Sequence, residues 1–170
     1  IIAFAFGMGG AVATFAALLH MTVHSLTKSA IFFTVGHAAQ KAGSQRIDDI
    51  RGLLALNPTI GWGLMLGSLA ILGLPPFGVF ASEFLILTTA MKQQPWATPI
   101  LLGALGIAFA AIFGRVQSMV LGHPAGRRLP HQPALLPVFA HLAIVLLLGL
   151  YIPPYLADWY RAAAGMIVGN

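Results

Sequence analysis

The sequence predicts an all-α fold, a polytopic transmembrane helix bundle of about five spans plus a truncated one. Of the 170 residues, 58% are hydrophobic and only 8% are charged, and the mean hydropathy is +0.87. A water-soluble domain carries about 25% charged residues, so this composition excludes the soluble class. The apolar runs are continuous and do not alternate every second residue, which favours helices over a transmembrane barrel.

The chain should begin with the end of an apolar helix at residues 1–10, followed by a long helix at about 11–37. The glycine-rich stretch 7–10 predicts a turn between the two. A charged loop is expected at 38–57, because this stretch holds most of the charged residues of the first half of the chain.

The next apolar run, 59–74, is interrupted by Pro75, Pro76 and Gly78. Adjacent prolines cannot both sit in the interior of a regular helix, since each lacks an N–H group and disfavours a helical residue before it. The sequence therefore predicts a broken or re-entrant helix at this point.

Three further spans are expected, at 79–91, 100–121 and 135–152. The tail, 155–170, mixes aromatic and basic residues in the manner of a segment at the membrane interface.

We expect residues 1–170 to form the C-terminal portion of a single transmembrane domain, because the chain opens inside an apolar run at Ile1 without a basic leader. The net charge of +5 comes mostly from the segments between the apolar runs and predicts no nucleic-acid partner. The absence of cysteine excludes a disulfide, a thiolate metal site or an iron–sulfur cluster in this chain.

The most informative residues are His20, His24 and Lys28, which follow one another at intervals of four inside the long helix. At about 100° per residue their side chains fall within an arc of about 80° on one helix face. An ionisable group at that depth costs roughly 2.5–3.5 kcal/mol on insertion scales. Three such groups on one face predict a polar path for protons or cations.

We call His20, His24 and Lys28 the ladder, and other interpretations of it remain open. Each histidine taken singly fits a core residue bonded to a neighbouring carbonyl group. The pair at i, i+4 could also bind a metal, although the positive charge of Lys28 one turn further disfavours a divalent cation. The same helix also carries the hydroxyls of Thr22, Ser25, Thr27 and Ser29, which hold water or bond back to their own backbone. We favour a proton relay and no metal, because imidazole titrates near physiological pH.

Glu83 lies seven residues beyond Pro76 in an otherwise apolar segment. It could be the structural partner of a basic residue on another helix. A carboxylate beside a broken helix also fits transport, because irregular backbone at membrane depth occurs where it lines a cavity. Arg115, His37 and His141 fit pairing, interfacial or packing roles better than chemistry.

These residues resemble a known family. The pattern from His20 through Lys28 to Phe33 is similar to the His-x3-His-x3-Lys helix of the antiporter-like subunits of respiratory complex I, Mrp cation/proton antiporters and group 4 hydrogenases. The stretch 72–84 resembles the later broken helix of that superfamily. The loop 43–53 looks closest to hydrogenase-4 component F, and the resemblance covers essentially 1–122.

The resemblance implies a proton-translocating membrane subunit of a redox-driven complex, of the hydrogenase-4 or NADH:quinone oxidoreductase type. Lys28 would be the central relay lysine, His20 and His24 its connecting histidines, and Glu83 the terminal group near the exit. The alternatives are a subunit of a Mrp-type Na⁺/H⁺ antiporter and a structural membrane anchor without ion flux.

The same resemblance implies that this chain holds no cofactor. Flavin, iron–sulfur, quinone or Ni–Fe centres are expected only in partner subunits. The implied partners are other membrane subunits of the complex and, through them, a peripheral redox arm, with protons or Na⁺ as the transported ion. The implied location is an energy-transducing membrane, the prokaryotic plasma (inner) membrane.

Overall fold

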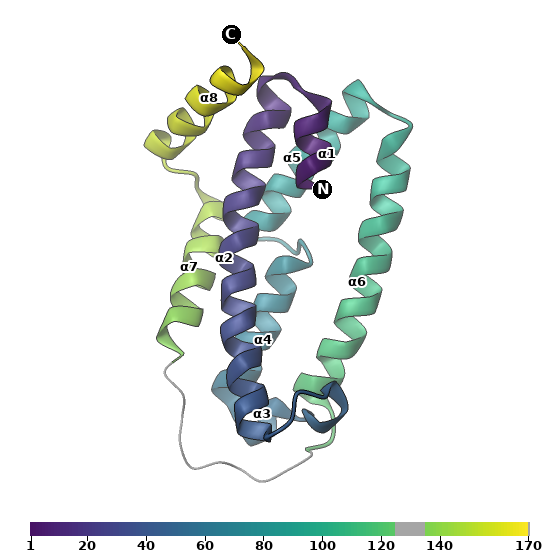
Figure 1. The fold of residues 1–170 in the computed structure, drawn as a ribbon, viewed down its shortest axis with the longest axis vertical. Helices are drawn as coiled ribbons and strands as arrows, with labels where there is room; N and C mark the ends of the chain where they lie inside the picture. The colour runs from purple at the N-terminus through teal and green to yellow at the C-terminus, as the bar shows by residue number, and fades with distance from the viewer. Residues whose placement is uncertain (125–134, 170) are drawn as a thin grey trace.

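The computed structural model describes residues 1–124 and 135–169, and this part of the chain consists of helices and connecting turns without a strand (Figure 1). The all-α class is therefore confirmed. The helices are α1 (Ile2–Met8), α2 (Gly10–Ala42), the short 3-10 helix η1 (Ile47–Asp49), α3 (Leu53–Leu56), α4 (Pro58–Ile71), α5 (Gly78–Gln93), α6 (Ala97–Leu121), α7 (Leu136–Leu150) and α8 (Pro154–Val168).

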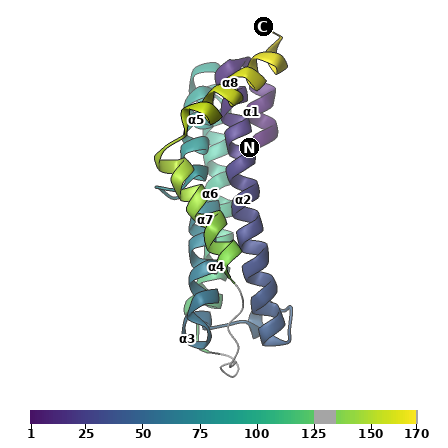
Figure 2. The same ribbon diagram turned by 90° about the vertical axis from the view of Figure 1, so that its left-hand side faces the viewer.

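Helix α2 is the element around which the others are arranged, as Figures 1 and 2 show. Its 33 residues extend over about 50 Å, and it packs against α1, α4, α5, α7 and α8. It begins at Gly10, directly after the turn at Gly9. The φ angles of these two glycines are +79° and +71°, so the predicted turn between the first two helices is confirmed. It continues about one turn past the expected end and stops before Gly43, which has a left-handed conformation.

The break predicted at Pro75 and Pro76 is confirmed, because residues 72–77 separate α4 from α5. Gly78 is not inside this break and instead begins α5. In Figure 1, α4 lies beside the C-terminal half of α2 and α5 lies beside its N-terminal half. With 14 and 16 residues, the two helices are about 21 and 24 Å long, each shorter than a hydrocarbon core of about 30 Å.

Fewer helices have the length and apolar composition of a membrane span than the five apolar runs predict. Among the described residues, α2 and α6 alone are long and apolar enough to cross a membrane, and a third span results if α7 and α8, bent by 79°, count as one. The difference arises because the runs at 59–74 and 79–91 form the short helices α4 and α5. These two together accompany α2 as one discontinuous helix.

Helices α7 and α2 both pack closely against the break between α4 and α5. A methyl group on Gly149 of α7 would collide with the backbone of Pro76 and Phe77. A methyl group on Gly78 would lie 2.8 Å from Val23 Cγ1 of α2 and 3.0 Å from the carbonyl oxygen of Val145. These two glycines therefore allow α7 and α2 to enclose the irregular backbone between α4 and α5.

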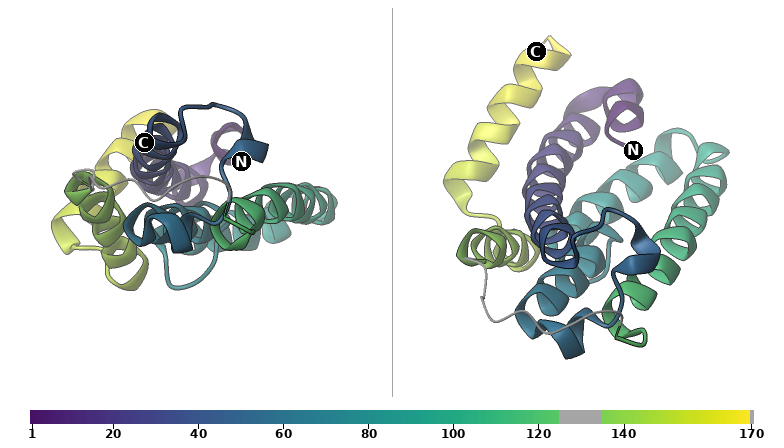
Figure 3. Two further views of the ribbon diagram at one scale, coloured as in Figure 1. Left: turned by 90° about the horizontal axis from the view of Figure 1, so that it is seen from below. Right: turned by 60° about the horizontal axis from the view of Figure 1, so that its bottom comes forward.

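Helix α6 contrasts with this tight packing. Its buried residues lie at its two ends, whereas only 11% of its most apolar stretch is buried and Ile107 is 74% exposed. Both views of Figure 3 show it at the margin of the bundle. The exposed middle of α6 is an apolar surface of the kind that lipid or further protein covers.

The tail expected at the interface forms α8, which packs on α2 through Tyr160. The Tyr160 hydroxyl donates a hydrogen bond of 2.7 Å to Thr22 Oγ1, and its ring meets Phe15 edge to face at 5.8 Å. Trp159 on the same helix is 68% exposed, and Arg161 pairs with Asp158 on the surface.

We predict that Gly149→Ala destabilises the protein by about 1–3 kcal/mol, because the backbone that the new methyl group would meet cannot move as a side chain can. The measurement is the thermal unfolding midpoint of the detergent-solubilised protein. Gly103→Ala is the matched control, since nothing lies within 4 Å of a methyl group there. Equal midpoints for both variants would contradict the close packing of α7 on the break.

We predict that Tyr160→Phe lowers stability by about 0.5–1.5 kcal/mol, the usual contribution of one hydrogen bond, because the ring remains and only the bond to Thr22 is lost. Tyr155→Phe serves as the control, since Tyr155 is 75% exposed. The same unfolding midpoint is measured. A midpoint for Tyr160→Phe as high as that of the control shows that α8 is not held by this bond.

Candidate functional site

The ladder on α2 passes from the interior of the structure to its exposed side. His20 is 1% exposed, His24 is half-buried and Lys28 is exposed. Each step of four residues turns the side chain by about 40° around the helix, which accounts for this progression. The rings of His20 and His24 lie 5.5 Å apart between centroids, with an angle of 34° between their planes. The structure thus brings the two histidines together and directs Lys28 away from the core.

His20 is joined to the discontinuous helix by a residue that the sequence pattern did not single out. Its Nδ1 lies 2.8 Å from Ser82 Oγ, and Ser82 is completely buried. Ser82 Oγ also donates a hydrogen bond of 2.9 Å to the carbonyl oxygen of Val79. A serine that bonds to its own helix is common, so the sequence holds no sign that this hydroxyl also meets a histidine 62 residues away.

Three other hydroxyls of this part of α2 bond back to their own helix. Thr22, Ser25 and Thr27 donate to carbonyl oxygens four residues earlier, at 3.1, 2.7 and 2.7 Å. Of the two interpretations left open for these hydroxyls, the backbone bond is therefore the one observed for Thr22, Ser25 and Thr27.

Glu83 is half-buried, and its carboxylate lies against the break. A side chain on Gly73 would collide with Oε2 of Glu83, and Gly73 has a φ of +68°. Within residues 1–124 and 135–169, Glu83 forms no ion pair with a basic side chain, and the surface pairs Arg51–Asp48 and Arg161–Asp158 are formed elsewhere. The carboxylate therefore meets irregular backbone instead of a basic partner.

The three residues to which we assigned no chemistry lie outside the contact between α2 and the break. Arg115 is exposed, and His37 is half-buried near the end of α2. His141 donates from Nδ1 to the carbonyl oxygen of Pro137 at 2.6 Å and lies against Phe33.

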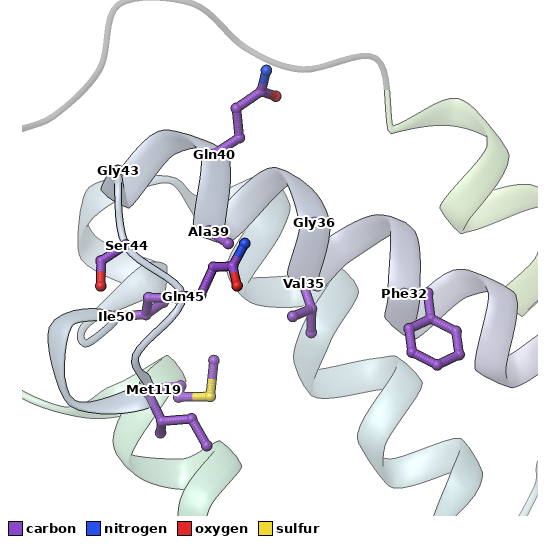
Figure 4. A pocket seen from close by; sticks show the side chains of 11 residues that line it. Phe32, Val35, Gly36, Ala39, Gln40, Gly43, Ser44, Gln45, Ile50 and Met119 are labelled. Atoms are coloured by element: carbon purple, nitrogen blue, oxygen red, sulfur yellow. The ribbon is translucent and has the colours of Figure 1, made fainter.

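A cavity of about 700 Å³ lies at the other end of α2, under the loop that leads to η1 (Figure 4). Phe32, Val35 and Gly36 line one side, and Met119 of α6 reaches it from another. Phe32 is one helical turn beyond Lys28, so the exposed side of α2 leads from the ladder to this cavity. The lining contains no ionisable side chain, which separates the cavity from the chemistry of the ladder.

A metal site receives no support from the described residues. No group of three or more histidine, cysteine, aspartate or glutamate side chains in this part of the chain could hold an ion. His20 and His24 thus lack a third ligand of these types.

Comparison with known proteins assigns the chain to a family. Residues 1–110 match the family described as NADH:quinone oxidoreductase/Mrp antiporter, TM. The hydrogenase-4 component F homolog of Methylacidiphilum infernorum is 47% identical over 95% of this chain and 34% of its own length. Subunit M of the NADH-quinone oxidoreductase of Pseudomonas aeruginosa is 30% identical, again over 95% of this chain and 34% of its own.

The fold has a solved counterpart as well. A chain in the structure of the Mrp complex from Dietzia sp. matches with a TM-score of 0.85 and 17% identity, over 98% of this chain and 40% of that one. The chain thus spans about a third of the length of the curated relatives named above. The resemblance found in the sequence is confirmed: this chain is an integral membrane protein that belongs to the NADH:quinone oxidoreductase/Mrp antiporter transmembrane family.

Proposed function

We propose that this chain belongs to a proton-translocating membrane subunit of a redox-driven complex, of the hydrogenase-4 or NADH:quinone oxidoreductase type. The observation that supports this proposal best is the contact of His20 and His24 on a helix that packs along a discontinuous one. Two imidazole rings 5.5 Å apart can exchange a proton directly or through one water molecule. In this proposal, residues 1–170 are the C-terminal portion of a single transmembrane domain.

Lys28 is the next proton carrier in this relay. Its ammonium group lies one turn from His24, on the exposed side of α2. A lone ammonium group in hydrocarbon costs roughly 2.5–3.5 kcal/mol, so that side fits a hydrated or protein-covered surface better than lipid. Lys28 takes up and releases a proton as neighbouring charges change.

Glu83 is the terminal group of the relay. Its position against Gly73 places a carboxylate where α4 and α5 leave backbone groups outside regular helix hydrogen bonding. Such groups bind water or an ion at membrane depth. Water connects the exposed side of α2 to this carboxylate in our proposal.

The redox chemistry takes place in partner subunits. This chain has no cysteine to hold an iron–sulfur cluster. In this proposal, flavin, iron–sulfur, quinone or Ni–Fe centres belong to partner subunits, and other membrane subunits connect this one to a peripheral redox arm. We place the complex in the prokaryotic plasma membrane.

Sodium–proton exchange is the second candidate function. One of the Na⁺/H⁺ antiporter subunits of Bacillus subtilis is 30% identical over 84% of this chain, and the solved Mrp complex shares the fold. Vesicles that contain the complete complex separate the two candidates. Acidification driven by electron transfer supports the first, and pH changes that require a Na⁺ gradient support the second.

We predict that Lys28→Ala abolishes coupled proton pumping while the complex still assembles, because Lys28 is exposed and its loss leaves no buried cavity. Proton uptake is measured in vesicles that hold the complete complex. Lys92→Ala is the control, since Lys92 is an exposed lysine at the end of α5. Normal uptake by the Lys28→Ala variant would favour a structural anchor without flux.

We predict that Glu83→Gln lowers proton uptake at least about tenfold, since a positioned proton-transfer group contributes about 10²–10⁴ in rate. Glutamine keeps the size of the side chain against Gly73 and removes its charge. Asp158→Asn removes a carboxylate from the surface of α8 and should leave uptake unchanged. Equal uptake in both variants would remove Glu83 from the relay.

A further inference from the structure

Ser82 forms the one side-chain hydrogen bond between the ladder of α2 and the discontinuous helix in the part of the chain that the structure describes. Its hydroxyl oxygen lies 2.8 Å from His20 Nδ1, and the exposed fractions of Ser82 and His20 are 0% and 1%. The bond is held in place by close packing one turn earlier on α5, where Gly78 meets Val23 of α2. The distance between the histidine and the serine is thus set by helix packing.

The second bond of Ser82 decides which nitrogen of His20 carries a hydrogen. A serine hydroxyl has one hydrogen to donate and can accept through its oxygen. Ser82 Oγ donates to the carbonyl oxygen of Val79, as Thr88 and Thr89 on the same helix donate to carbonyl oxygens of the preceding turn. Its oxygen is then the acceptor for His20, which requires a hydrogen on Nδ1.

We infer that Ser82 is a positioning residue that holds His20 in the tautomer with its hydrogen on Nδ1, so that Nε2 is the nitrogen that takes up a proton. This inference rests on the proposed function for its consequence in transport. Neutral His20 accepts a proton at Nε2, and the imidazolium releases it from the same atom. In both states Nδ1–H donates to Ser82, so the proton transfer requires no rearrangement of this bond.

A direct consequence concerns the route of the proton. A proton that crosses an imidazole ring enters at one nitrogen while another leaves from the second. Nδ1–H donates to Ser82, whose own hydrogen is bonded to the carbonyl oxygen of Val79. A peptide carbonyl oxygen does not take up a proton near neutral pH, so no proton passes from His20 into α5. Proton transfer to and from His20 therefore takes place at Nε2, and α5 does not receive a proton from this ring.

Magic-angle-spinning NMR of the full-length protein in lipid, with ¹⁵N-labelled histidine, tests the inference. The two tautomers give different ¹⁵N signals, and the variant His20→Gln identifies those of His20. We expect a hydrogen on Nδ1 in the unmodified protein and a shift toward the other tautomer in Ser82→Ala. Thr89→Val is the matched control, because it removes a buried hydroxyl of α5 that bonds only to its own helix.

A hydrogen on Nε2 in the unmodified protein overturns the inference, whether or not the variant folds. An unchanged tautomer in Ser82→Ala also overturns it. In vesicles with the complete complex, we expect Ser82→Ala to lower proton uptake several-fold and Thr89→Val to leave it unchanged. A shifted tautomer with normal uptake supports the role of Ser82 and contradicts the relay role of His20, so the two proposals fail separately.

Discussion

The enclosure of a broken helix is the constraint on which the rest of this structure depends. Backbone groups outside regular helix hydrogen bonding cannot face lipid, so the segment between α4 and α5 must be covered by protein or water. Gly149 and Gly78 let α7 and α2 approach that segment more closely than any larger residue would allow. This close approach also sets the separation of α2 and α5, and with it the contact of His20 with Ser82.

The regular helix α2 and the discontinuous helix formed by α4 and α5 therefore share one interface. Helix α2 is regular and brings ionisable side chains, whereas α4 and α5 supply irregular backbone and a carboxylate. Ser82 and Glu83 are neighbours on α5 whose side chains point about 100° apart, so one meets the ladder and the other meets Gly73. A displacement of the start of α5 would change both contacts at once.

The sequence predicted the all-α class, the break at Pro75 and Pro76 and the turn before α2, because each follows from local chemistry. The number of spans and the bond to Ser82 depend on how distant segments pack, which a single amino-acid sequence does not reveal. Two runs of apolar residues look the same whether they cross a membrane separately or lie end to end. Likewise, the spacing of His20, His24 and Lys28 predicts a shared face, whereas the burial of each residue depends on which helices cover that face.

The exposure of Lys28 follows from the regular geometry of α2. A ladder with steps of four residues drifts around the helix, so a histidine fixed in the core at position 20 places an ammonium group outside it at position 28. Phe32, 70% exposed, continues that side toward the cavity at the end of α2. A surface that combines a charge with large apolar side chains suits neither bulk water nor lipid alone, because lipid disfavours the ammonium group and water disfavours the phenyl ring. Contact with a polar, partly hydrated protein surface satisfies both, and it would let the charge of Lys28 respond to charges across that contact.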